Sequence, residues 1–85
     1  MHLESVEIYS DQSNMAVIRH PGRRFPGILV QGDTLHALYS QAELALGNGA
    51  DAMDELSDLR DRLHEMLDHY KAVLLEHGQM LPYAE

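Results

Sequence analysis

The chain has 85 residues, no cysteine and a formal net charge of −8 at pH 7. A chain of this length supports one small hydrophobic core, so we expect a single domain over residues 1–85. The negative charge repels the phosphates of DNA and RNA at long range and argues against direct binding of polymeric nucleic acid. Without disulfides, stability has to come from helix packing or a partner subunit, which predicts a cytoplasmic homo-oligomer.

The first ten residues, "MHLESVEIYS", carry acidic side chains early and lack the basic and apolar segments of a signal peptide. No uninterrupted apolar run in the chain approaches the roughly 20 residues that span a bilayer. We therefore expect no association with membranes.

Residues 4–32 are predicted to form a three-stranded antiparallel sheet. Side chains alternate along residues 6–9, and residues 15–19 form a second apolar run rich in β-branched side chains. The intervening "SDQSN" favours local side-chain to backbone hydrogen bonds, so the two runs indicate a hairpin. After a proline-containing loop, "GILVQG" at 27–32 predicts a third strand, which its apolar centre suggests is central or covered on both faces.

A first helix is predicted over residues 33–47, where apolar side chains recur every three or four positions. Asp33 or Thr34 can cap its first turn, and "GNG" at 47–49 can end it. The predicted fold class is therefore α+β, with element order β-β-β-α-α.

A longer second helix is predicted over residues 51–77, opened by Asp51 and stopped by Gly78. At about 1.5 Å per residue it would be about 39 Å long, more than three short strands can cover. Its apolar stripe is nearly a heptad repeat, so part of it is expected to pack on the first helix and part on another subunit. A helical hairpin over one face of the sheet, within one chain, is the alternative.

Three of the six basic residues fall within six positions, beside and between two Pro-Gly pairs, in "RHPGRRFPG". Guanidinium groups suit phosphate or carboxylate, an aromatic ring can stack on a base, and a helix start offers free backbone amides. The sequence thus predicts a site for a small phosphorylated or nucleotide-like anion. The candidate ligand-binding residues are Arg19, Arg23, Arg24, Phe25, Asp33 and Thr34.

Two features of this candidate site stay open at the level of sequence. The helix start lies at the far end of the third strand, about 15 Å from the arginines, so the two parts would meet only across a subunit interface. Alternatively, the arginines pair with the acidic residues of the long helix, and Phe25 folds inward to close the core.

The segment "HEMLDH", His64–His69, differs from the zinc-protease helix motif because its histidines are five residues apart and lie on different faces. His64 with Asp68 and Glu65 with His69 have the spacing of solvent-face pairs, and no third metal ligand follows. No serine stands in a nucleophile-elbow motif. We therefore expect no metal, no cofactor, no catalytic residues and no enzymatic activity.

The "PGRRFPGILVQGDTL" segment, with two helices after it and "LPY" near the end, resembles a family of small uncharacterised bacterial and phage proteins with an R-R-F-P-G…Q-G-D core. This resemblance extends over residues 15–83. A stretch of about twenty residues also resembles the HicB antitoxin family, in which the first strands lead through a Pro-Gly loop to a Q-G-D-T helix start, although HicB proteins have a strand in place of the long second helix. The matching residues are Pro26, Gly27, Gln31, Gly32, Asp33 and Thr34. Neither resemblance implies an enzyme.

The sequence predicts a non-enzymatic binding protein and leaves two partners open. The first is the phosphorylated small ligand at the arginines. The second is a basic protein, bound in an antitoxin-like or inhibitor-like manner by the acidic face of the long helix. The candidate residues for this alternative are Asp54, Asp58 and Asp61.

Overall fold

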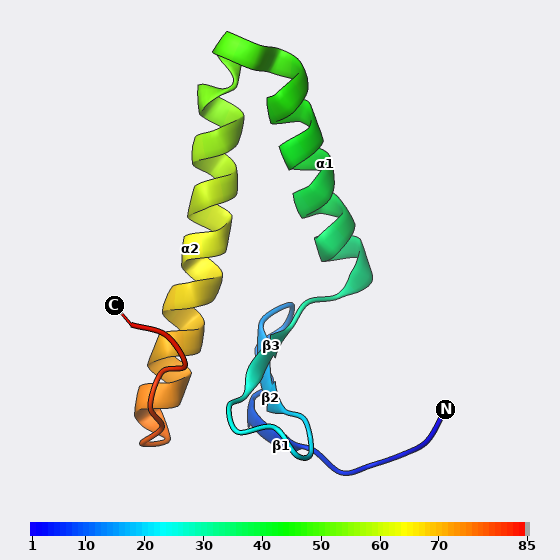
Figure 1. The fold of residues 1–85 in the computed structure, drawn as a ribbon, viewed down its shortest axis with the longest axis vertical. Coiled ribbons are helices and arrows are strands. Elements are labelled where there is room, and N and C mark those ends of the chain that lie inside the picture. Colours follow the sequence, from blue (N-terminus) through cyan, green and yellow to red (C-terminus); the bar gives the residue numbers. More distant parts are fainter. Residues whose placement is uncertain (85) are drawn as a thin grey trace.

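The computed structural model describes residues 1–84, in which a three-stranded sheet precedes two helices (Figure 1). The strands are β1 (Glu7–Ser10), β2 (Ala16–Arg19) and β3 (Gly27–Leu29). The helices are α1 (Gly32–Asn48) and α2 (Met53–Glu76), joined by one turn of 3₁₀ helix, η1 (Gly49–Asp51). Both strand pairings are antiparallel, which confirms the predicted α+β class and the β-β-β-α-α order.

The strand order is β1-β2-β3, so β2 is the central strand and β3 lies at an edge. The interpretation of the third strand as central is therefore wrong. β3 ends at Leu29, and its side chains serve two different surfaces: Ile28 packs against the core, whereas Leu29 is 53% exposed. An edge strand with one apolar face against the core and one apolar face left open has the same sequence pattern as a strand that is covered on both faces.

The "SDQSN" hairpin forms as predicted. The backbone amide of Met15 donates to the carbonyl of Gln12 over 3.0 Å, and Asn14 takes a φ of 64°, a conformation that asparagine tolerates in turns. A bulge between Ile8 and Ser10 shifts the register of β1 against β2. The turn therefore connects β1 to β2, and the bulge sets how the two strands pair.

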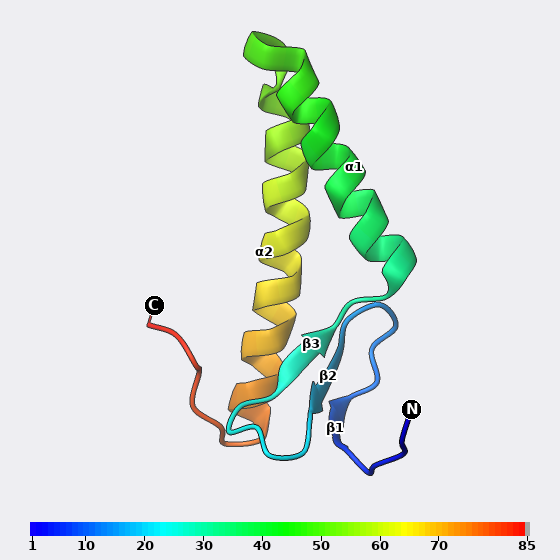
Figure 2. The same ribbon diagram turned by 45° about the vertical axis from the view of Figure 1, so that its right-hand side comes forward.

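The core lies where the last turns of α2 cross one face of the sheet (Figure 2). Val17 of β2 and Leu74 of α2 are completely buried, and Tyr70 and Val73 complete the cluster. α1 begins beyond β3 and runs toward η1, away from the sheet (Figure 1). The alternative, in which both helices of the hairpin cover one face of the sheet, is therefore wrong. The helix that packs on the sheet is α2.

Both helices begin at other residues than expected. α1 starts at Gly32 with Gln31 at the N-cap position and no side-chain cap, so neither Asp33 nor Thr34 is the cap; the Asp33 carboxylate instead accepts a hydrogen bond from the Thr34 amide over 2.8 Å. α2 starts at Met53, and Asp51 belongs to η1. No helix in residues 1–84 is long and apolar enough to cross a membrane.

Candidate functional site

The arginine loop, residues 20–26, connects β2 to β3 and is anchored at both ends. At its start the Arg23 amide donates to the carbonyl of His20 over 3.1 Å, with Gly22 at a φ of 80°. At its end Pro26 is buried, and its carbonyl accepts a hydrogen bond of 2.5 Å from the hydroxyl of Tyr70 on α2. The loop is therefore held against the core, while its tip is exposed to solvent.

The three arginines near this loop have different surroundings. Arg19 of β2 pairs with Glu7 of β1, and its Nε donates to the Glu7 carboxylate over 2.6 Å. This hydrogen bond raises the pKa of the Arg19 guanidinium above its ordinary value. The guanidinium of Arg24 lies 5.1 Å from the centre of the Phe25 ring, within the range of a cation–π contact. Among the described residues, Arg23 forms no ion pair. Arg23 is therefore the arginine most available to a ligand.

The alternative, in which these arginines pair with acidic residues of the long helix, is wrong. Arg19 uses Glu7 of β1, and the ion pairs of α2 lie within the helix itself: Arg60 with Asp61 and His64 with Asp68. The 3.4 Å contact between His64 and Asp68 is the expected exposed pair four residues apart. The acidic residues of α2 therefore form no ion pair with the arginine loop in residues 1–84.

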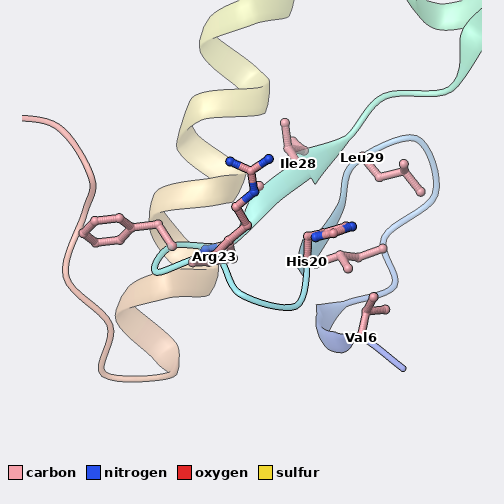
Figure 3. Close-up of a pocket in the computed structure, with 9 residues that line it drawn as sticks. Val6, His20, Arg23, Ile28 and Leu29 are labelled. Carbon is pink, nitrogen blue, oxygen red and sulfur yellow. The ribbon is translucent and has the colours of Figure 1, made fainter. Parts of the chain in front are cut away.

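Arg23 lines a cavity of about 410 Å³, which we call the sheet-face pocket (Figure 3). Because Val17 points toward α2, its neighbour Ile18 points to the opposite face of the sheet, as does Ile8, its partner across the ladder. In Figure 3, α2 lies on one side of the strands and the labelled side chains of Val6 and Leu29 lie on the other side. The residues that line the sheet-face pocket include Val6, Ile18, His20, Arg23, Phe25 and Leu29.

A second, more polar cavity of about 480 Å³ adjoins the sheet-face pocket and shares its residues Val6, His20 and Arg23. It also contains the Arg19–Glu7 pair. His20 lies 3.0 Å from the Pro21 carbonyl through Nδ1, an arrangement in which Nδ1 carries the proton and Nε2 is left for another partner. Arg23 thus offers hydrogen-bond donors and His20 Nε2 an acceptor between an apolar surface and a polar one. This combination suits an anion that also carries a hydroxyl or N–H group and an apolar portion.

The structure does not bring Asp33 and Thr34 into this site. They follow β3, whereas the arginine loop precedes it, and neither residue lines the sheet-face pocket or its polar neighbour. A site within one chain therefore consists of the arginine loop and the open face of the sheet, without the start of α1.

His20 and the apolar residues of the open sheet face were missed by sequence reasoning. The signal for Val6 and Ile18 was present in the strand alternation, but the alternation does not say which face the helix will cover. Phe25, which was expected either to stack on a ligand or to fold inward, is half-buried and lines the pocket.

The three aspartates of the acidic alternative lie on the exposed surface of α2. Asp61 pairs with the adjacent Arg60 over 3.0 Å, whereas Asp54 and Asp58 have no ion-pair partner among the described residues. Residues 1–84 contain no group of three or more histidine, cysteine, aspartate or glutamate side chains placed to hold a metal ion.

A small α+β chain with a loop-bordered pocket on the open face of its sheet is the class that these observations define. The family model described as a family of unknown function, DUF6959, matches residues 1–83, and the chain belongs to this family. The expectation of an uncharacterised family is thereby confirmed. Neither the search of curated proteins nor that of solved structures found a significant match.

Proposed function

We propose that this protein is a non-enzymatic binding protein that holds a small phosphorylated or nucleotide-like anion at the sheet-face pocket. The observation that carries the proposal is the position of Arg23, which lines both the apolar pocket and its polar neighbour without an ion-pair partner in the described chain. A guanidinium so placed can donate to a phosphate while the ligand's apolar part covers the open sheet.

The neighbouring groups support this assignment. His20 Nε2, which lines the same two cavities as Arg23, can accept a hydrogen bond from a hydroxyl or N–H group of a nucleotide-like ligand, and the Phe25 ring already contacts one guanidinium, that of Arg24. Arg19 is less available because it is paired with Glu7. In an acidic chain, such a local positive site selects a small anion, because the surrounding negative charge disfavours a long polyanion.

Differential scanning fluorimetry tests the proposal with AMP, GMP, ATP, inorganic phosphate and, as an uncharged control, adenosine. A ligand present at ten times its Kd adds about 1.4 kcal/mol to the free energy of unfolding, which raises the Tm of a domain this small by about 5–10 °C. The shift should be lost in Arg23→Ala and kept in Arg60→Ala, an arginine variant on α2 outside both cavities. If no phosphorylated compound raises the Tm of the native chain, the proposal is wrong.

The acidic protein-interaction function, antitoxin-like or inhibitor-like, is the second candidate. It is favoured by the exposure of Asp54 and Asp58 without ion-pair partners in the described chain. It predicts binding to a basic protein that weakens with salt and with Asp54→Lys, Asp58→Lys reversal. Binding that ignores both changes would show that these aspartates are only solvated surface.

A further inference from the structure

A third cavity, of about 520 Å³, opens between the two helices and the edge strand β3, and we call it the helix–sheet groove. Twelve residues line it, and none of them carries a formal charge at pH 7. They come from α1, α2, β3 with the residue on either side of it, and the C-terminal segment after α2; the ones used below are Leu35, Leu38, Leu63, Leu67 and Tyr83. The absence of charge is notable because 20 of the 85 residues are acidic or basic.

The leucines of the groove are only partly covered within one chain. Leu35 of α1 is 60% exposed, and Leu63 and Leu67 of α2 are 45% and 51% exposed. They are exposed because the two helices meet at η1 and diverge toward the sheet (Figure 1). The apolar side chains of the two helices therefore face a groove that no part of residues 1–84 fills.

The size of the chain's surface gives an independent measure of what is uncovered. A compact monomer of 9.6 kDa exposes about 5,100 Å², whereas this chain exposes 6450 Å². Its radius of gyration is 15.4 Å, compared with about 12 Å for a compact domain of this length. The extended residues 1–6 contribute to the excess, and the splayed helices contribute to it as well (Figure 1). A standard interface removes about 800 Å² from each partner, which is within this excess.

We propose that a second copy of this chain covers the helix–sheet groove and forms a two-fold symmetric dimer. A groove without charge has nothing with which to select a charged partner. A two-fold axis beside the groove would place the leucines of one copy against those of the other, because a symmetric dimer uses the same surface of both copies. The net charge of −8 acts in the same direction, because two acidic copies repel least where neither carries charge. The groove shares Pro26, Gly27 and Ile28 with the sheet-face pocket but includes neither His20 nor Arg23. A loss of dimerisation in Leu67→Asp and a loss of ligand binding in Arg23→Ala therefore test two separate proposals.

Native mass spectrometry and light scattering of the full chain test the dimer, which has twice the 9.6 kDa mass of the monomer. Leu67→Asp places a charge in the groove, and burying it should raise the dimer dissociation constant at least about 100-fold. Leu75→Asp is the matched control: it lies on the same helix, is 61% exposed and does not line the groove, so the dimer should persist. Far-UV circular dichroism establishes that each variant has kept its helices.

An NMR measurement on the native sequence avoids any dependence on variants. In a mixture of isotope-labelled and unlabelled chains, intermolecular contacts should appear at the methyl groups of Leu35, Leu63 and Leu67. The proposal is overturned by a monomer mass at 100 μM protein, by a folded Leu67→Asp chain that still dimerises with unchanged affinity, or by intermolecular contacts confined to the open face of the sheet.

Discussion

Tyr70 is the residue on which the candidate site depends most directly. Its ring is part of the core, its hydroxyl donates to the carbonyl of the buried Pro26, and it lines the helix–sheet groove. One side chain thus connects the long helix, the end of the arginine loop and the start of β3. Without its hydroxyl, the Pro26 carbonyl is left in an apolar surrounding with no donor from α2.

Tyr70→Phe is expected to lower the free energy of unfolding by about 1–2 kcal/mol, because a buried carbonyl loses its hydrogen bond while the ring stays in place. Urea denaturation measures the change. Tyr39→Phe is the control, since the Tyr39 hydroxyl donates to Glu43 at the exposed surface of α1 and its loss should cost less than about 0.5 kcal/mol. Equal effects of the two substitutions would contradict the anchoring role of Tyr70.

The same residue predicts a loss of stability at alkaline pH. Burial, and to a smaller extent the nearby Tyr83 and Tyr9, raises the pKa of Tyr70 above its ordinary value. The unfolded chain therefore releases the Tyr70 proton first, so the contribution is complete below about pH 10 and is lost as the pH rises above it. Urea titrations between pH 8 and 11 should show a steeper decline for the native chain than for Tyr70→Phe, by no more than about 1.4 kcal/mol per pH unit. Parallel curves would exclude the effect.

At the scale of elements, the end of α2 decides where the C-terminal segment goes. The Gln79 amide donates to the Leu74 carbonyl over 2.9 Å and the Gly78 amide to the Leu75 carbonyl over 3.1 Å, the hydrogen-bond pattern of a Schellman motif. Gly78 has the positive φ of 67° that this motif requires. The chain is thereby turned back so that Leu81 packs against the core and Tyr83 lines the groove.

Gly78→Ala and Gly47→Ala should change stability in opposite directions. Alanine at Gly78 would have to adopt a left-handed conformation and should cost about 1–2 kcal/mol. Gly47 lies inside α1 without a positive φ, and a Cβ there meets nothing within 4 Å, so alanine should add about 0.5–1 kcal/mol. Both values follow from urea denaturation. Stabilisation by Gly78→Ala would contradict the turn described here.

The whole molecule exposes more surface than a compact chain of its mass, and its small core occupies only one end. Among residues 1–84, six hydrophobic residues are buried, four of them in the cluster between α2 and the sheet. The other end consists of the helical hairpin around η1, in which Ala45 and Ala52 are the buried residues. Between the two ends lies the helix–sheet groove, so folding and dimerisation should be coupled.

Coupling predicts that the Tm depends on protein concentration. If the groove is covered by a second copy, each tenfold increase in concentration adds about 1.4 kcal/mol to the stability of the dimer and should raise the Tm by about 3–5 °C. Scanning calorimetry from 5 to 500 μM measures this slope. Leu75→Asp should retain it and Leu67→Asp should lose it; a Tm of the native chain that is constant over this range would oppose the coupling.

The order of elements was predictable because each depends on neighbouring residues. Alternation, the "SDQSN" turn, the three- and four-residue spacing of leucines and the glycines at 49 and 78 act within a few positions. Helix starts were misplaced by one or two residues because no side chain caps them, and η1 shifts the start of α2. The cluster of three arginines was identified from the sequence. The ion pair of Arg19 was not, because Glu7 lies next to Arg19 only when β1 pairs with β2 in the sheet.

The sequence by itself determined the fold class, the positions of the turns and the concentration of arginines in one loop, all of which follow from local backbone and side-chain preferences. The tertiary structure alone decided which face of the sheet α2 covers, and hence that Val17 is buried while Ile8 and Leu29 are exposed. It also decided that the helices diverge and leave Leu63 and Leu67 uncovered. An apolar stripe specifies that a surface is to be buried, but its covering partner depends on how distant elements meet in space.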